Sequence, residues 1–473
     1  MKHYRLFYCA LSMCLLTLWT ACTVENADNE IAMPGEEKPS NTDSTQTLTV
    51  AEKELQENYE MLYFYFIDAA QKLGDIHSYM GHGEEAGYSP SRFEYPDVYY
   101  MYSKMGDSYT FYVGPYYVGK YDLDMESDPS YNLAVSVEKA ESQLVITQVF
   151  PNGPGSKAGL KEKDTILYVG SSNPGSAKDF EMLTTGSEGD SISLKILRGP
   201  DTLDISAKLF CYLNPTVFLS YRDSIPVIKI TGFENFSATS CSDANNANDV
   251  NSFKGTKDEI STVLKATKGQ TIIDLRGNPG GSIDACFSAA ELFLSKGDTI
   301  ARLEYTDVAP DNAHQMIINQ SVVASEDGVG KGRYFVFLAD SNSASCAETM
   351  LMGVTNTTKS PIVGMLTYGK GIGQYYIPTS AGGYSIITAM RVYDKNGFFY
   401  HDKGIVPDYN IADSTKALDK AVEIAKLAKE KRTQGYGTKE LGHFNNSLAK
   451  KASFSNEPFK GGAYRIIKNP FAK

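Results

Sequence analysis

One segment decides how this chain folds, and it runs from Tyr334 to Gln374: YFVFLADSNSASCAETMLMGVTNTTKSPIVGMLTYGKGIGQ. The apolar run 334–339 predicts a buried strand, and the polar residues 340–343 are typical of a turn. A helix is predicted to begin close to Ser345. The serine then lies at a helix N-terminus, where free backbone N–H groups and the positive end of the helix dipole are found.

A lysine follows the next predicted strand of the same segment. That strand covers 361–365, and Lys370 comes after it between Gly369 and Gly371. Because glycine carries no side chain beyond a hydrogen, other backbone can approach this lysine closely. A serine at a helix start and a lysine at a glycine-flanked strand exit are the components of a Ser/Lys nucleophile–base pair.

Two motifs in this segment resemble those of the carboxy-terminal processing (tail-specific) serine protease family. Residues 343–348, SASCAE, are similar to the family's Ser-Ala-Ser-Ala-Ser-Glu, and residues 369–374, GKGIGQ, are similar to its Gly-Lys-Gly-Thr-Val-Gln. The resemblance implies that Ser345 is the nucleophile, that Lys370 is the base and that Gln374 holds the lysine amine. Cys346 stands where the family has alanine. That position supplies a backbone N–H, so we expect the change to be tolerated.

A third motif, TIIDLRGNPGG at 271–281, is similar to the family's Asp-Leu-Arg-x-Asn-x-Gly-Gly element. It predicts a buried strand, a glycine turn and a helix over 282–294. Glycine is needed where a backbone N–H must point at a developing oxyanion. The resemblance implies an oxyanion hole formed by the N–H of Cys346 with that of Gly280 or Gly281, and the sequence does not choose between the two glycines.

Residues 127–212 resemble a bacterial PDZ domain. The stretch 154–170 is similar to the signature Pro-x-x-x-Ala-Gly-Leu…Gly-Asp-x-Ile-Leu, with Lys163 in place of its second glycine. Such domains add a peptide strand to a sheet edge and hold the peptide's C-terminal carboxylate on backbone N–H groups. The resemblance places this carboxylate-binding loop at Leu133, Ala134 and Val135. The alternative is a degenerate PDZ domain that serves only for packing.

Composition and length set the organisation of the chain. At 473 residues it is too long for one ordinary domain, and 42% hydrophobic and 22% charged residues are typical of globular proteins. The formal charge of −12, with no basic block, argues against a nucleic-acid partner. We expect an α/β and α+β multidomain protein: a signal peptide (1–22), a flexible tether (23–46), a helical N-terminal cap (47–126), a PDZ β-sandwich-like domain (127–212), a crotonase-like α/β Ser/Lys protease core (213–432) and a polar C-terminal tail (433–473).

The first 22 residues have the pattern of a signal peptide. Lys2 and Arg5 precede an apolar stretch over 6–21, which has the length of a signal-peptide core. Small residues before Cys22 resemble a bacterial lipoprotein cleavage box, although Trp19 stands where that box usually has Leu or Val. The resemblance implies lipidation of Cys22 and anchoring in the cell envelope of a Gram-negative bacterium, facing the periplasm or the outer membrane. The alternative is an ordinary secretory signal or a chance cysteine.

The other cysteines give no sign of a metal site or a disulfide framework. The four that follow Cys22 are scattered, without metal-ligand spacing. An exported protein can form disulfides, but dispersed cysteines in a large chain are typical of buried small residues, and we predict no disulfide bond. These four are Cys211, Cys241, Cys286 and Cys346.

Several stretches allow more than one interpretation. The tyrosine-rich stretch 93–117 favours aromatic packing in the cap over a sugar- or ligand-binding surface. Residues 364–370 satisfy Gly-x-x-x-x-Gly-Lys, but a P-loop needs Ser or Thr next and then a helix, whereas Gly371 and a predicted strand follow. The polar stretch 237–252 predicts a surface loop.

Three smaller features concern the surroundings of the site. Residues 401–408, HDKGIVPD, resemble the family's closing Gly-Val-x-Pro-Asp turn. The histidines show no zinc pattern, and His401 is the one that could line the cleft. Glu348 is expected to order the start of the helix that follows Ser345.

The resemblance implies a serine endopeptidase, without metal or cofactor, that cleaves exported proteins recognised through free C-terminal tails. A lysine in water has a pKa of about 10.4, so burial must lower it by about 3 units before Lys370 can act as a base near pH 7. Two other hypotheses remain: a catalytically silent peptide- or ligand-binding lipoprotein on the same fold, and a tethered PDZ scaffold. Retention of Ser345, Lys370 and Gln374 together argues against the silent protein. The sequence does not predict the oligomeric state.

Overall fold

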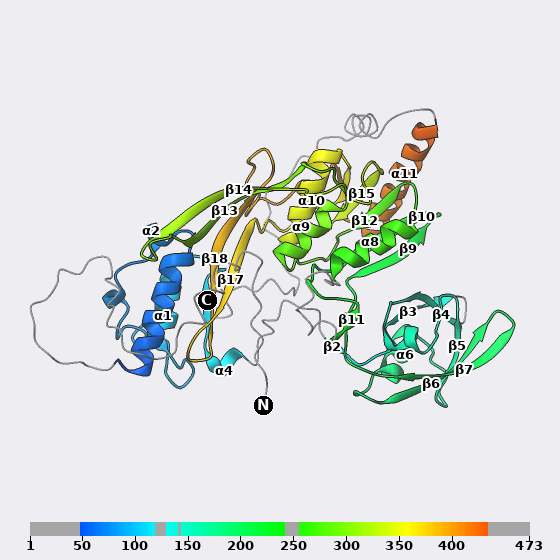
Figure 1. Cartoon of the computed structure of the whole chain (residues 1–473), viewed down its shortest axis with the longest axis horizontal. Helices are drawn as coiled ribbons and strands as arrows, with labels where there is room; N and C mark the ends of the chain where they lie inside the picture. The colour runs from blue at the N-terminus through cyan, green and yellow to red at the C-terminus, as the bar shows by residue number, and fades with distance from the viewer. Residues whose placement is uncertain (1–47, 119–128, 141–142, 242–254, 434–473) are drawn as a thin grey trace, which may run out of the picture.

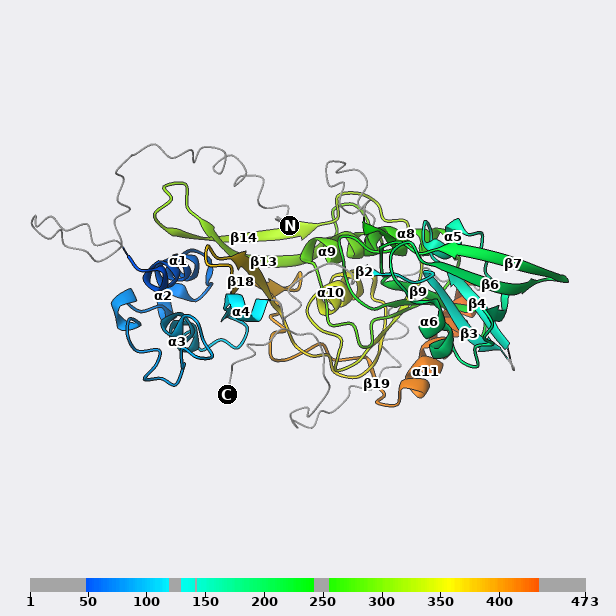
Figure 2. The same ribbon diagram turned by 90° about the horizontal axis from the view of Figure 1, so that it is seen from below.

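The computed structural model describes residues 48–118, 129–140, 143–241 and 255–433. The predicted signal peptide with Cys22, the tether and almost all of the C-terminal tail lie outside these ranges. The described residues form three regions in a row, with the N-terminal helices at one end, the core in the middle and the PDZ domain at the other end (Figures 1 and 2). The predicted multidomain fold class is confirmed. No helix within the described ranges is both long and apolar enough to cross a membrane.

The core is built on a six-stranded sheet, in which only β9 runs antiparallel to its neighbour. In spatial order its strands are β19 (Tyr409–Asn410), β16 (Ile362–Gly364), β15 (Phe335–Ala339), β12 (Thr271–Asp274), β10 (Ile225–Ile230) and β9 (Val217–Arg222). Every residue of β12 and β15 is buried, as expected for a sheet with helices on both faces. This explains why the run at 334–339 is continuously apolar.

Alternate side chains of β15 face opposite layers. Phe335 and Phe337 pack in the cluster that contains α8 (Thr256–Ala266), α9 (Ile283–Glu291) and α10 (Cys346–Thr358). Val336 and Leu338 pack with α11 (Ser414–Thr433) on the other face. The helices predicted after the glycine turn and after Ser345 therefore lie side by side, as α9 and α10, on one face of the sheet.

A second sheet leads from the core to the N-terminal helices (Figure 1). Its long strand β18 pairs along one edge with β17 and along the other with β13 and β1. The strands of this sheet are β1 (Phe111–Val113), β13 (Thr299–Val308), β14 (Gln315–Val323), β17 (Ile372–Pro378) and β18 (Tyr384–Tyr393). Because β17 begins two residues after Lys370, the same sheet carries the end of the lysine loop.

The N-terminal region is helical, as predicted, and also contributes strand β1. Its elements are α1 (Val50–Tyr65), α2 (Ala69–Lys72), η3 (Ile76–Ser78), α3 (Pro96–Lys104) and α4 (Pro115–Val118). Thr49 starts α1 with a capping box to Glu52. The tyrosines Tyr99, Tyr102 and Tyr112 are buried in one cluster, where Tyr102 donates a hydrogen bond to Asn58. This arrangement supports the packing interpretation of the tyrosine-rich stretch.

The PDZ domain is a five-stranded antiparallel sheet with two short helices. In spatial order the strands are β3 (Val135–Ala140), β4 (Gln143–Val149), β5 (Thr165–Val169), β6 (Ser191–Arg198) and β7 (Asp201–Lys208), and the helices are α5 (Pro154–Lys157) and α6 (Ala177–Thr184). Strand β3 lies at the edge of the sheet. A PDZ domain accepts a peptide strand at such an edge.

The junction between the PDZ domain and the core corrects two predictions. Cys211 and Cys241 form a disulfide, so the prediction of no disulfide bond is wrong. The two cysteines flank paired strands of a small sheet, β2 (Pro129–Ser130), β8 (Tyr212–Leu213) and β11 (Thr239–Ser240), and no local sequence pattern reveals this pairing. Residues 237–240 are buried here, so this part of the predicted surface loop is also wrong, while 242–254 lie outside the described residues.

Candidate active site

The predicted nucleophile occupies a strained position at the start of α10. Ser345 has φ 53° and ψ −117°, a backbone conformation that non-glycine residues rarely adopt. The preceding residue is fixed because the Ala344 N–H donates to the Asn278 backbone oxygen at 2.9 Å. Asn278 is fully buried and belongs to the glycine turn after β12. The turn with the predicted oxyanion glycines and the turn with the serine are thus hydrogen-bonded to each other.

Glu348 joins the serine to the lysine loop. One carboxylate oxygen accepts the backbone N–H groups of Ser345 and Lys370, at 3.0 and 2.8 Å. The other accepts the Gly369 N–H at 2.7 Å and the Thr367 hydroxyl. The side chain is completely buried, and this burial raises the pKa of the carboxyl to about 7, although the four donors favour its ionised form. The sequence predicted only the contact at the helix start; the contacts to the lysine loop were missed.

Lys370 lies in a setting that favours a neutral amine. Burial lowers its pKa to about 8, against the opposing influence of Cys346, Asp107 and Glu348. Its Nζ donates to Gln374 Oε1 at 2.8 Å, so the structure brings the predicted base and its predicted holding residue together. Within the described residues, no hydrogen bond joins Ser345 Oγ to Lys370 Nζ.

The two candidate oxyanion glycines differ in how their N–H groups are used. Gly280 packs on the nucleophile, since a Cβ added to it would lie 2.8 Å from Ser345 Cβ and 3.0 Å from the Cys346 nitrogen. However, the Gly280 N–H donates to Asn278 Oδ1 at 2.8 Å. Among the described residues, the N–H groups of Gly281 and Cys346 donate no hydrogen bond. These two donors are therefore available for an oxyanion.

The closing turn at 401–408 supports the lysine loop from outside. The Asp402 N–H donates to the Gly369 oxygen at 2.8 Å, and the Ile405 N–H donates to Thr367 Oγ1 at 2.7 Å. Gly369 needs its glycine here, because its φ is 90° and a Cβ would lie 2.8 Å from the Gly404 nitrogen. Since β17 follows Lys370 directly and no helix begins there, the P-loop alternative is excluded.

The predicted PDZ residues lie in their own domain, away from the catalytic residues. Leu133 and Ala134 are buried, and Val135 begins the edge strand β3. Ala134 has φ 51°, and its N–H donates to Asn132 Oδ1 at 2.8 Å. One of the three expected carboxylate donors is therefore engaged by a neighbouring side chain.

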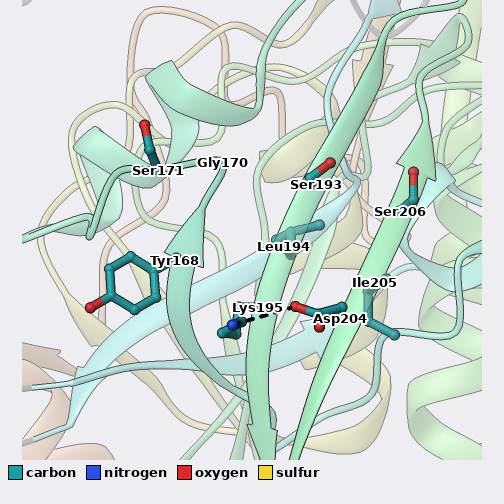
Figure 3. A pocket seen from close by; sticks show the side chains of 9 residues that line it. All are labelled: Tyr168, Gly170, Ser171, Ser193, Leu194, Lys195, Asp204, Ile205 and Ser206. Carbon is teal, nitrogen blue, oxygen red and sulfur yellow. Dashed lines mark ion pairs between the residues drawn. The ribbon is translucent and has the colours of Figure 1, made fainter.

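A shallow pocket of about 550 Å³ lies on the sheet of the PDZ domain (Figure 3). Its walls come from β5, β6 and β7, with Lys195 and Asp204 forming an exposed ion pair at 3.9 Å. The pocket contains neither the carboxylate-loop residues nor any predicted catalytic residue. We assign it no part in the chemistry.

Two family models match separate parts of the chain. Residues 224–411 match the profile of peptidase family S41, and residues 132–209 match that of the PDZ domain. The core of the chain, residues 224–411, belongs to peptidase family S41. Together with the relatives of the chain, this match supports a serine-type protease. One relative is "Probable CtpA-like serine protease" of Staphylococcus haemolyticus, which is 26% identical over 362 residues. The match covers 74% of this chain and 67% of the relative.

A second relative of the same description, from Staphylococcus aureus strain N315, is 27% identical over 303 residues. That match covers 61% of this chain and only 56% of the relative. Solved structures with a similar course include a photosystem II D1 C-terminal processing protease (15% identity, TM-score 0.43, covering 77% of this chain and 94% of that one). Another is a lipoprotein from Streptococcus agalactiae (11% identity, TM-score 0.44, covering 82% and 100%).

Proposed function

We propose that this S41 member is a serine endopeptidase in which Ser345 is the nucleophile and Lys370 is the general base. The observation that carries the proposal is the position of Glu348, which accepts the backbone N–H groups of both residues and so fixes the two loops together. The lowered pKa of Lys370, about 8, supplies the neutral amine that such a base requires. A catalytically silent binding protein would have no use for this combination.

The reaction would proceed in two stages. Neutral Lys370 accepts the proton of Ser345 Oγ, the oxygen attacks the peptide carbonyl, and Lys370 returns the proton to the leaving amine. Lys370 then accepts a proton from water, which hydrolyses the acyl-enzyme and restores the serine. We assign the oxyanion hole to the N–H groups of Gly281 and Cys346, because the Gly280 N–H is engaged by Asn278.

We further propose that the PDZ domain recognises the C-terminal tails of protein substrates. The edge position of β3 supports strand addition there. With the Ala134 N–H engaged by Asn132, the carboxylate would be held by the N–H groups of Leu133 and Val135. The tethered scaffold remains the second candidate, and it predicts that tail binding survives while cleavage is absent.

We also propose export to the cell envelope of a Gram-negative bacterium, with a lipid anchor on Cys22. The disulfide Cys211–Cys241 supports export, because such bonds persist in oxidising compartments. Mass spectrometry of the protein made in a Gram-negative host should find a diacylglyceryl group on Cys22. A mature N-terminus at another residue would refute the lipid anchor on Cys22 but would remain consistent with export.

The decisive experiment compares cleavage of an unfolded protein and of tail peptides by residues 23–473 with cleavage by Ser345→Ala and Lys370→Ala. We expect losses of at least about 1,000-fold in kcat for each variant. Circular dichroism serves as the folding control. Wild-type protein that binds tails but cuts nothing across pH 6–10 would favour the scaffold, and activity retained by Lys370→Ala would refute the dyad.

A further inference from the structure

We propose that the N-terminal region completes the catalytic site, with Tyr109 as a positioning residue that fixes Gln374 and covers the Lys370 amine. The inference rests on the proposed roles of Ser345 and Lys370. It goes beyond them because Tyr109 belongs to neither the S41 match at 224–411 nor the PDZ match at 132–209.

Tyr109 contacts the base in two ways. Its backbone oxygen accepts Gln374 Nε2 at 2.6 Å, while Gln374 Oε1 accepts Lys370 Nζ at 2.8 Å. Its ring centroid lies 5.4 Å from Lys370 Nζ. Because the Gln374 amide is held at both ends, its oxygen faces the lysine and cannot exchange places with its nitrogen. The backbone contact sets the orientation of the acceptor, and the ring excludes water from the amine.

The segment around Tyr109 is itself held rigidly. Asp107 accepts the Tyr109 N–H at 3.0 Å and the Thr110 hydroxyl at 2.7 Å. Thr110 Oγ1 in turn accepts the Thr388 N–H at 2.9 Å. Thr388 is the cross-strand partner of Gln374, so these bonds close a ring of contacts around the base. The N-terminal segment is thereby placed by the strand next to the one that carries Gln374.

Two further side chains pack against Tyr109 and hold it in place over the amine. The Tyr109 hydroxyl donates to the Tyr368 hydroxyl at 3.4 Å, and the Tyr109 ring lies 5.7 Å from the ring of His401. His401 is mostly buried, and its Nδ1 has no hydrogen-bond partner among the described residues. The cover therefore joins an N-terminal segment, the lysine loop and the closing turn.

The cover should determine the state of the base. A buried amine covered by the Tyr109 ring loses hydration, which disfavours its charged form. The charged or titratable groups around it are Glu348 and Cys346 on α10, Asp107 and Tyr109 on the N-terminal segment, Tyr368 on the lysine loop, and His401 with Asp402 on the closing turn. Removing the Tyr109 ring would admit water without removing any carboxylate, so the lysine should become harder to deprotonate.

The test uses the full mature chain and two separate readouts. One is the pH dependence of Ser345 labelling by a fluorophosphonate. The other is the titration of Lys370 by competitive acetylation and mass spectrometry in a Ser345→Ala background. The variants are Tyr109→Ala, which removes the ring, and Tyr109→Phe, which keeps it. Tyr88→Ala removes a half-buried ring elsewhere in the same region and is the matched control.

For Tyr109→Ala we expect the midpoint of the Lys370 titration to rise by about one pH unit or more. Labelling of Ser345 at pH 7 should fall about tenfold and recover at higher pH. Tyr109→Phe and Tyr88→Ala should keep the wild-type midpoint. A folded Tyr109→Ala with an unchanged midpoint overturns the inference. If Tyr109→Ala does not fold, Thr110→Val provides the test, because it removes the hydroxyl that accepts the Thr388 N–H. We expect this variant to raise the Lys370 midpoint by a smaller amount, and an unchanged midpoint refutes the proposal. Wild-type protein whose serine is never labelled would refute the proposed function, while the lysine titration would still test the cover.

Discussion

Two glutamates, the fully buried Glu348 and the partly buried Glu259, have similar roles at two places in this molecule. Glu348 on α10 accepts backbone N–H groups and a hydroxyl from the loops that carry Ser345 and Lys370. Glu259 on α8 accepts the N–H groups of Thr216 and Val217 and the hydroxyls of Thr216 and Ser237, where the chain enters the core from the PDZ domain. Burial raises the pKa of each carboxyl to about 7.

The difference lies in what each carboxylate holds. Glu348 organises the two loops that carry the proposed nucleophile and the proposed base, so we expect its loss to disturb the geometry of the proposed site. Glu259 ties the junction to α8, beside the segment that ends in Cys241, so an error there changes how the domains are joined. A carboxylate can anchor several N–H groups in a buried place where no regular strand or helix satisfies them. The surrounding elements decide whether the result is catalytic or structural.

Among the changes that test this comparison, Glu348→Gln should have the largest effect on activity. A carboxamide presents an NH2 group to two donors at one of its ends, so one pair of hydrogen bonds must be replaced by repulsion. We expect kcat to fall about 100-fold and stability to fall by about 2 kcal/mol. Steady-state kinetics and urea unfolding measure both. Wild-type kcat in a folded variant would mean that Glu348 only orders the helix start.

Removing the disulfide tests whether the junction depends on Glu259 alone. We expect Cys211→Ser with Cys241→Ser to lower the free energy of unfolding by about 2–4 kcal/mol. Hydrolysis of a small activated ester should change little, because none of the hydrogen bonds to Glu348 is altered. The single variant Cys286→Ser, at a buried free cysteine, is the control for loss of a thiol. Equal stability of the double variant and the wild type would show that Glu259 suffices.

Glu259→Gln should show most directly that the two glutamates have different roles. We expect a loss of about 1–2 kcal/mol in stability and a change below about threefold in ester hydrolysis. Cleavage of long tails, which would need the PDZ domain in place, should fall further than ester hydrolysis. A loss of ester hydrolysis as large as that of Glu348→Gln would abolish the distinction between catalytic and structural anchors.

The smallest effect concerns pH. The folded-state pKa of Glu259 is raised above its ordinary value of 4.5 to about 7, so the favourable contribution of its bound proton is present below pH 4.5 and is lost as pH rises through 7. The stability of the wild type relative to Glu259→Gln should therefore decline between pH 5 and pH 8. The slope cannot exceed about 1.4 kcal/mol per pH unit. Urea unfolding at several pH values measures it, and a relative stability that rises with pH would contradict the raised pKa.

The sequence motifs predicted those site residues that lie within the motifs themselves. They did not predict residues that reach the site from elsewhere in the chain. The sequence motifs led to Ser345, Lys370 and Gln374, and the structure joins the latter two by a hydrogen bond. The motifs could not indicate Tyr109, because its contact to Gln374 spans 265 residues and uses a backbone oxygen that any residue would offer. The choice of Gly281 over Gly280 likewise depends on where the Asn278 side chain points, which no residue pattern encodes.

The fold was predictable where periodicity was strong. The strand at 334–339 and the helix after Ser345 appear as β15 and α10. The end of α1 at Tyr65 was less predictable, since the chain turns at Phe66 to meet β18 through the Ile67 N–H and the Thr388 oxygen. The disulfide was missed because its cysteines lie beside β8 and β11, and no local sequence pattern indicates that these two strands pair.

Strand β1 also has a consequence for the order in which the protein matures. Phe111 in β1 pairs with Ile386 in β18, roughly 275 residues later in the chain. During synthesis from the N-terminus, β1 cannot pair with β18 until most of the chain has been made. We expect Tyr109 to reach Gln374 only at that stage. A nascent chain that lacks β18 would leave Lys370 without its contact to Tyr109, so we expect the proposed activity to arise only when synthesis is almost complete.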